Sequence, residues 1–169
     1  MNAFAKAVQS LPAGRYLLAV SGGRDSMALL HAFAETRPGD LSAVATFDHG
    51  TGVAAAEAVE LVVRECLRRG ISVVAGRAPE RPGSPRASES VLRHARWAFL
   101  RAVAEERRAV IVTAHTRDDQ AETVAMRILR DASARGLAGM AWAPAGVARP
   151  FLDLSRADLA RYAGEAGIP

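Results

Sequence analysis

Cysteine and lysine are almost absent from this sequence of 169 residues. Cys66 is the only cysteine, which excludes an internal disulfide and a zinc site built from several cysteines, and is consistent with a reducing, cytoplasmic setting. Lys6 is the only lysine, so the net charge of +4 rests almost entirely on arginine. No apolar run approaches the length of a membrane-spanning helix, and we therefore expect a protein without membrane contact.

Short apolar runs alternate along the chain with segments of helical spacing. The runs at 16–20, 41–47, 71–76 and 109–114 are rich in Val, Ile or Leu, as buried parallel strands tend to be. A final strand is expected near 147–151, and helices at about 26–36, 53–69, 88–107, 117–130 and 155–166. The order predicts an α/β fold: a doubly wound, mostly parallel five-stranded sheet with helices on both faces. Irregular segments are expected at 77–88 and 131–146. Ligands of such sheets bind outside the carboxyl ends of the strands.

A glycine turn, Ser21-Gly22-Gly23-Arg24-Asp25-Ser26, separates the first strand from its helix. Glycines allow positive φ and a close approach of an anion, and a helix start offers free N–H groups to phosphate. The hydroxyls of Ser21 and Ser26 can add hydrogen bonds. A Walker A loop needs a lysine here and a dinucleotide fingerprint needs G-x-G-x-x-G, and both are missing. A plain turn with Ser or Asp as helix cap is the alternative.

The second strand ends in Asp48 and His49. Their position at the predicted ligand edge suits contacts to a base or a ribose. Asp48 and Gly50 are equally typical of a simple turn, so both interpretations stay open.

The fourth strand runs into "AHTRDDQAET" at 114–123. Thr116 and Asp119 have the spacing of a capping box, and acids in a first turn suit the helix dipole. Capping does not account for Asp118, Asp119 and Glu122 together with His115 at one strand end. Carboxylates gathered in this way favour a cation, either a metal ion or an ammonium group.

The helix expected at 88–107 carries an apolar stripe, with Glu89, Arg93 and Arg96 on the opposite face. A solvated face with a Glu89–Arg93 pair is one interpretation. The other is that Arg93 or Arg96 neutralises charge that develops on phosphate.

Several motifs together resemble a known family. The turn "SGGRDS" is similar to the PP-loop of ATP pyrophosphatases, which cleave ATP between the α- and β-phosphates. With "DHG", "ESVLRHARW", "AHTRDDQAET", "GLAGM" and "ARPFLDLSR", it resembles the N-terminal PP-loop domain of the tRNA(Ile)-lysidine synthetases. Thr116 stands where a second His is common, and Leu92 and Trp97 replace Ala and Tyr. We expect residues 1–169 to form one such domain, without the tRNA-binding domains that follow it in the family.

The resemblance implies an ATP-dependent carbon–nitrogen ligase. ATP would adenylate the C2 carbonyl oxygen of the wobble cytidine in tRNA(Ile), and free lysine would displace AMP to give lysidine. The implied roles are catalysis by Asp25, Arg93, Arg96 and His115, ATP binding by Ser21, Gly22, Gly23, Asp25, Ser26, Asp48 and His49, Mg²⁺ binding by Asp25, and lysine binding by Asp118, Asp119 and Glu122.

Two other functions remain open. One is a different PP-loop enzyme, either amide-forming with ammonia or tRNA-modifying; a cysteine-dependent thiolase is disfavoured because Cys66 has no second cysteine to work with. The other is a nucleotide-binding module without catalysis, which the carboxylates around the turn argue against. The sequence leaves the oligomeric state open, a homodimer included.

Overall fold

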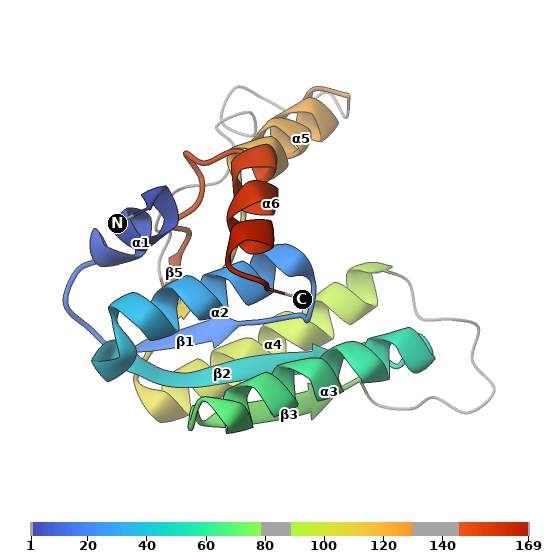
Figure 1. Cartoon of the computed structure of the whole chain (residues 1–169). Helices are drawn as coiled ribbons and strands as arrows, with labels where there is room; N and C mark the ends of the chain where they lie inside the picture. The colour runs from blue at the N-terminus through green and yellow to red at the C-terminus, as the bar shows by residue number, and fades with distance from the viewer. Residues whose placement is uncertain (1, 79–88, 130–145, 169) are drawn as a thin grey trace.

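The computed structural model describes residues 2–78, 89–129 and 146–168 and contains one parallel sheet with the strand order β3-β2-β1-β4-β5 (Figure 1). The strands are β1 (Tyr16–Ala19), β2 (Leu41–Asp48), β3 (Val73–Arg77), β4 (Val110–Val112) and β5 (Val147–Ala148). The helices are α1 (Ala3–Gln9), α2 (Arg24–Thr36), the short 3-10 turn η1 (Pro38–Asp40), α3 (Val53–Arg68), α4 (Glu89–Arg107), α5 (Arg117–Ile128) and α6 (Arg156–Glu165). The predicted α/β fold is confirmed. Most of the irregular segments expected at 77–88 and 131–146, with the "GLAGM" motif, lies outside the described residues.

Two apolar clusters cover the two faces of the sheet. On one face, Leu18 of β1 packs with residues of α1, α2, α3 and α6. On the other face, Leu17 of the same strand packs with Leu100, Val103 and Ala104 of α4. Neighbouring residues of a strand point to opposite faces, so one short apolar run serves both layers. The expected double winding is therefore present.

The direction in which the chain adds strands to the sheet reverses beside β1. This strand pairs in parallel with β2 on one side and with β4 on the other. The chain reaches β4 only after β3, through α4 on the opposite face. The connection that leaves β1 runs through α2 on one face, whereas the connection that enters β4 runs through α4 on the other face. This is the topological switch point at which α/β proteins bind ligands.

Helix α4 departs in part from its expected apolar stripe, which consists of Val91, Leu92, Ala95, Ala98, Phe99, Ala102 and Val103. Val103 is buried as expected, and Leu100 and Ala104 are buried beside it, whereas Val91 is 43% exposed. Arg96 lies one turn before Leu100 and two turns before Val103, so it belongs to the inner face. The prediction that Arg96 faces away from the core was wrong, since its side chain lines a cavity on the inner face of α4. Arginine tolerates such a position because its long apolar stem can pack against other apolar groups.

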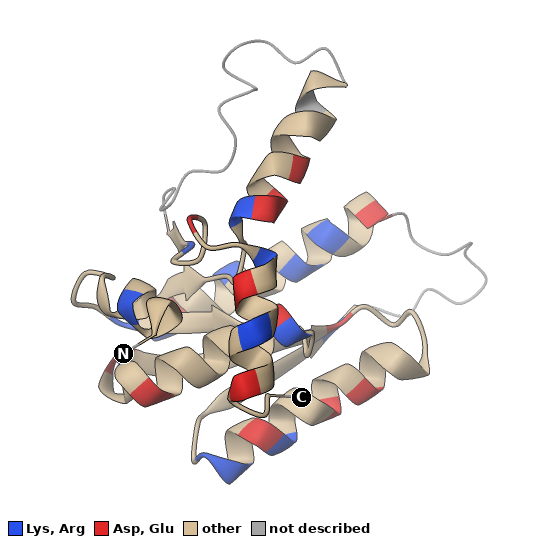
Figure 2. Ribbon diagram, turned by 45° about the horizontal axis from the view of Figure 1, so that its top comes forward, with Lys and Arg blue, Asp and Glu red and all other residues tan. Residues whose placement is uncertain are grey.

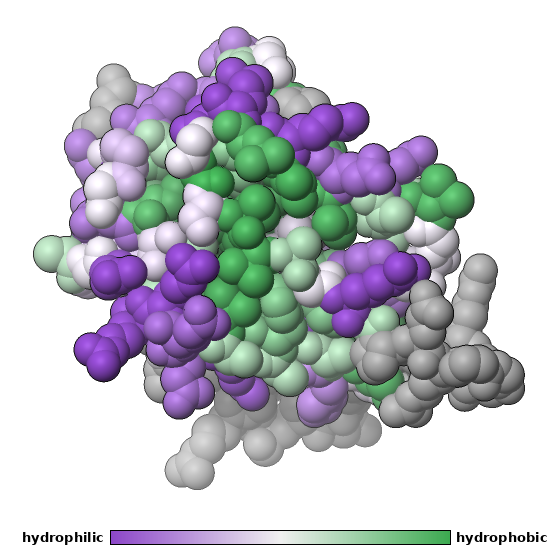
Figure 3. All heavy atoms as spheres, turned by 90° about the horizontal axis from the view of Figure 1, so that it is seen from below, coloured by the Kyte–Doolittle hydropathy of each residue, from purple (hydrophilic) through white to green (hydrophobic). Residues whose placement is uncertain are grey.

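Two further features were not predicted. Helix α1, capped by the Asn2 side chain, packs Phe4 against Phe151 and Tyr162. Strand β3 forms a sheet edge with half-buried valines, and an apolar strip crosses this side of the molecule when it is seen from below (Figure 3). In the described part of the chain, no helix is long and apolar enough to cross a membrane.

Candidate active site at the switch point

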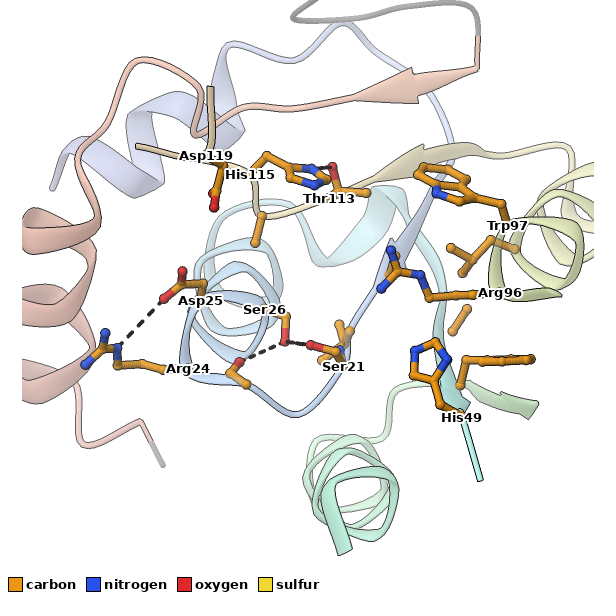
Figure 4. A pocket seen from close by; sticks show the side chains of 17 residues that line it. Ser21, Arg24, Asp25, Ser26, His49, Arg96, Trp97, Thr113, His115 and Asp119 are labelled. Carbon is orange, nitrogen blue, oxygen red and sulfur yellow. Dashed lines mark hydrogen bonds and ion pairs between the residues drawn. The ribbon is translucent and has the colours of Figure 1, made fainter. Parts of the chain in front are cut away.

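A cavity of about 440 Å³ lies at the carboxyl ends of β1, β2 and β4 (Figure 4). Helices α2 and α5 contribute their first turns to its wall, and α4 contributes its inner face. Most of the predicted site residues line it, namely Ser21, Gly23, Asp25, Ser26, His49, Arg96, His115 and Asp119. Four separate stretches of sequence thus meet in one place, as expected for ligand binding at strand ends.

The two glycines of the turn have different tasks. Gly22 has φ +84°, and a Cβ added there would lie 2.7 Å from the carbonyl oxygen of Ala58 in α3. Gly23 is the N-cap of α2 with an ordinary φ of −74°, and it lines the cavity. Of the two properties of glycine considered above, positive φ is used by Gly22 and not by Gly23. Gly22 allows close packing of the turn on α3, and Gly23 leaves room on the cavity side.

Hydroxyl groups fix the shape of this turn. Ser26 Oγ accepts a hydrogen bond from the Ser21 N–H at 3.1 Å and donates to the Gly23 carbonyl at 2.8 Å. Ser21 Oγ lies 3.2 Å from Ser26 Oγ. Because the Ser26 proton is used inside the turn, its main effect is to hold the backbone N–H groups of the turn in place.

Asp25 lies in the first turn of α2, beside the cavity, and does not cap the helix. Its carboxylate is 3.8 Å from Arg24 Nε. Burial raises the pKa of Asp25, and the charge of Asp119 raises it further, while Arg24 opposes both effects. A negative charge held in such surroundings would be stabilised by a cation.

Asp48 and His49, the two residues at the end of β2 that were predicted to contact a ligand, lie in different surroundings. Asp48 accepts the Gly50 N–H at 2.7 Å, lies 3.4 Å from Arg77 and does not line the cavity. These contacts match the turn interpretation of Asp48, and its role in ATP binding stays a prediction. His49 does line the cavity, and its buried Nδ1 has no hydrogen-bond partner among the described residues. Burial, and then the charge of Arg96, lowers the pKa of His49.

Arginine side chains gather on one side of the cavity. Arg96 lines it, and its buried Nε finds no partner in the part of the chain that the structure describes. Burial and the charge of nearby Arg93 lower the pKa of Arg96. Arg93 is exposed and outside the lining, although its charge also acts on Arg149 and His115. Of the two candidates, Arg96 has the better position to contact a ligand.

His115 is held between the arginines and the acids. Its Nδ1 lies 2.7 Å from Thr113 Oγ1, so the hydroxyl fixes the orientation of the ring. Burial lowers the pKa of His115, and the charge of Arg149 lowers it further, against the opposing effect of Asp119. A histidine with a lowered pKa is neutral at pH 7 and can accept a proton.

The three acids of α5 are engaged within the protein. The predicted capping box is present: Asp119 Oδ2 accepts the Thr116 N–H at 2.7 Å, and Thr116 is fully buried. Arg156 of α6 donates to Asp119 Oδ1 at 2.7 Å and to Glu122 Oε1 at 3.1 Å. Asp118 accepts the Arg156 backbone N–H at 2.7 Å and does not line the cavity. Asp119 alone of the three borders the cavity.

Sequence reasoning missed several residues of the site. Trp97, Phe47 and Thr113 line the cavity or hold its groups, and Trp97 stands at a position that the resemblance had marked only as a departure. Arg156 was quoted within a motif but given no role, because nothing in its surroundings indicates a contact with residues 34 to 38 positions earlier. No group of three metal-binding side chains occurs within 2–78, 89–129 and 146–168.

Comparisons with known proteins agree with this geometry. The chain is 42% identical over 165 residues to a tRNA(Ile)-lysidine synthase of Novosphingobium aromaticivorans, covering 93% of this chain and 50% of that protein. It is 39% identical over 159 residues to the enzyme of the same name from Thermobifida fusca, covering 92% and 49%. The chain therefore spans about half the length of these curated relatives.

Solved structures share the fold. The U34-tRNA thiolase NcsA from Methanococcus maripaludis, solved with its [4Fe-4S] cluster, superimposes with a TM-score of 0.79 at 16% identity, over 98% of this chain and 63% of that one. An NH3-dependent NAD synthetase from Campylobacter jejuni gives a TM-score of 0.61 at 11% identity, over 98% and 69%. The family model described as "PP-loop domain" matches residues 1–169. Motifs, cavity and relatives thus lead to one assignment: the chain belongs to the PP-loop domain family.

Proposed function

We propose that this chain is the catalytic domain of a tRNA(Ile)-lysidine synthetase. It would use ATP to attach lysine to C2 of the wobble cytidine of tRNA(Ile), with release of AMP and pyrophosphate. The observation that carries the proposal is the single cavity that joins the glycine turn, Arg96, His115 and the acidic start of α5. The relatives named above, at about 40% identity, support the choice of reaction.

The glycine turn would hold the triphosphate. Its N–H groups, fixed by Ser26, and the start of α2 offer donors and a positive helix end to phosphate oxygens. His49 and Arg96 lie across the cavity, each with a buried nitrogen that has no partner among the described residues, and they suit the ribose or the α-phosphate. We place the β- and γ-phosphates near Asp25 because the helix start lies there.

Mg²⁺ would be held by Asp25 together with phosphate oxygens. One or two carboxylates and the substrate phosphates are a common ligand set for this ion, and the raised pKa of Asp25 indicates a charge that a cation would stabilise. The ion would offset negative charge on the departing pyrophosphate.

Adenylation would begin at the C2 carbonyl oxygen of the cytidine. This oxygen attacks the α-phosphorus, the bond from that phosphorus to the bridging oxygen breaks, and pyrophosphate leaves. Arg96 would stabilise the charge on the α-phosphate, because a guanidinium held in a partly buried site acts strongly on a neighbouring anion. Arg93, exposed and one turn earlier, would attract the polyanionic tRNA from solvent.

Lysine transfer would use the acidic side of the cavity. Asp119 and Glu122 would bind the ε-ammonium group and bring it to C2, and Asp118 would position α6 through the Arg156 N–H. The ammonium must lose a proton before its nitrogen can attack. Neutral His115 is placed to accept that proton. The nitrogen then bonds to C2, the C2–O bond breaks, and AMP leaves with the oxygen.

The test is an incubation of the chain with ATP, Mg²⁺, labelled lysine and a tRNA(Ile) transcript. We expect label in the tRNA and equal amounts of AMP and pyrophosphate. Asp25→Ala should lower the rate by at least about a hundredfold, as the loss of a group that stabilises transition-state charge does. Asp153→Ala, at an exposed carboxylate outside the cavity, is the control and should keep full activity.

The same assay separates the alternatives. Pyrophosphate release that responds to ammonia and ignores lysine would refute the proposal and favour an amide-forming synthetase. Nucleotide binding without any cleavage would indicate a non-catalytic module. A sulfur-transferring activity is disfavoured because Cys66 is fully buried and burial raises the pKa of its thiol to about 11.

A further inference from the structure

Arg156, the first residue of α6, already occupies the acids to which the proposed function assigns lysine. Its guanidinium bridges two carboxylates, with one nitrogen 2.7 Å from Asp119 Oδ1 and the other 3.1 Å from Glu122 Oε1. Its backbone N–H donates to Asp118 Oδ2 at 2.7 Å. An ammonium ion that entered this site would meet a cation already in place. The two cannot use the same acceptor atoms together.

The guanidinium of Arg156 is held less firmly than the backbone N–H of the same residue. The Arg156 side chain is 41% exposed and that of Glu122 is 65% exposed, and ion pairs in such positions are weak because water competes for both partners. Asp119 Oδ2 is committed to Thr116, so Oδ1 is the oxygen left for a cation. The side chain can therefore leave while Asp118 keeps the start of α6 in position.

The same guanidinium lies beside the proposed phosphate end of the cavity. It binds Asp119, which lines the same cavity as Asp25 and the glycine turn, and its charge acts on Asp25. Bound ATP would bring several negative charges to this end. Arginine binds phosphate through two parallel hydrogen bonds, so the nucleotide would compete with the two carboxylates for the guanidinium.

We infer that Arg156 is a specificity-determining latch on the amine site: its guanidinium occupies Asp119 and Glu122 until bound nucleotide draws it to the phosphates and frees both carboxylates. The inference rests on the proposed function and adds an order to it. ATP and lysine would bind with positive coupling, and by linkage each would tighten the other by the same factor. Free lysine would then find its acceptors only where an activated nucleotide is present.

Calorimetric titration of the whole chain with lysine tests the latch. Each protein is titrated alone and after saturation with Mg²⁺ and α,β-methylene-ATP, which cannot be cleaved between the α- and β-phosphates. The variants are Arg156→Gln and Arg156→Lys. The matched control is Arg161→Gln, which removes one positive charge from the same helix at an exposed pair with Asp158.

We expect the nucleotide to tighten lysine binding roughly five- to tenfold in the wild type and in Arg161→Gln. Arg156→Gln should bind lysine tightly without nucleotide, and the nucleotide should then add less than about twofold. Arg156→Lys keeps the charge but lacks the planar fork, so its coupling should be intermediate. The latch is overturned if Arg156→Gln weakens lysine binding equally in both states, or tightens it equally in both.

Two further outcomes also decide the matter. If circular dichroism shows that Arg156→Gln does not fold, Arg156→Lys decides, and wild-type coupling in that variant overturns the latch. If the wild type binds the nucleotide but no lysine, the proposed lysine step fails. The latch is then judged by nucleotide affinity alone: a loss in Arg156→Gln but not in Arg161→Gln supports it, and equal affinities overturn it.

Discussion

Replacing the two glycines of the turn one at a time separates its structural from its binding role. In Gly22→Ala, the new methyl group would lie 2.7 Å from the Ala58 carbonyl oxygen and 2.9 Å from the Ala58 Cβ, at a residue with φ +84°. The left-handed backbone costs about 1–2 kcal/mol for a residue with a Cβ. Displacing α3 to relieve the contact costs about 1–3 kcal/mol more. We therefore expect the free energy of unfolding to fall by about 2–5 kcal/mol.

Urea denaturation followed by circular dichroism measures this change, and Gly23→Ala is the internal comparison. A Cβ at Gly23 would meet only Ser21 Oγ, at 3.7 Å, and the backbone there is ordinary. Gly23→Ala should stay within about 0.5 kcal/mol of the wild type, yet bind α,β-methylene-ATP at least tenfold more weakly, because the methyl group enters the cavity. The reasoning is refuted if Gly22→Ala is as stable as the wild type, or if Gly23→Ala is the less stable of the two.

Three further measurements test the electrostatics. Asp25→Asn should raise the free energy of unfolding at pH 7 by up to about 1 kcal/mol, and with it the Tm. The reason is that burial raises the pKa of Asp25, so its charged form is unfavourable above that pKa. An unchanged or lower Tm contradicts this. Glu65→Gln should cost about 1 kcal/mol at pH 7 after solvent screening, since Arg68 and Arg69 lower the pKa of Glu65 to about 2. The difference from the wild type should shrink as the pH falls from about 4.5 toward 2. Cys66 should react with a thiol reagent only in the denatured protein, and fast labelling of the folded chain would contradict its burial.

Patterns local in sequence predicted the fold well. Each apolar run of four to eight residues became a parallel strand, and the helix that follows each run was placed to within about two residues. The hydrogen bonds within the glycine turn and within the capping box of Thr116 and Asp119 are equally local, since they join residues at most five positions apart. The orientation of α4 could not be predicted from local sequence patterns. A helix with apolar residues on several sides can turn either face inward, and the contact with β1 and β4 decides.

Partners distant in the sequence account for the rest. The three acids of α5 were expected to favour a metal ion or an ammonium group. In the structure Asp119 and Glu122 bind the guanidinium of Arg156, which comes from a separate helix 34 to 37 positions later in the sequence. For Asp48 the sequence left a ligand contact and a turn equally open, and the structure shows the turn, closed by the hydrogen bond from the Gly50 N–H. Spacing along a chain indicates which side chains lie near one another. Which of them remain free to contact a ligand depends on the hydrogen bonds that they already form within the folded protein.

The arrangement of charge within the cavity relates these details to the two proposed substrates. Arg96 and His49 lie on one side and the carboxylates of Asp25 and Asp119 on the other (Figure 4). Outside the cavity the start of α5 carries both signs of charge, with Arg117 beside the acids (Figure 2). In a site for ATP alone Asp119 would still cap α5, but its charge would raise the pKa of Asp25 and oppose the approach of phosphate. A reaction that joins a polyanion to an amine needs both sides, with a neutral proton acceptor between them. His115, kept neutral by burial and by Arg149, lies at that boundary. Under the proposed function, the acids would distinguish an amine-transferring member of the family from one that only cleaves nucleotide.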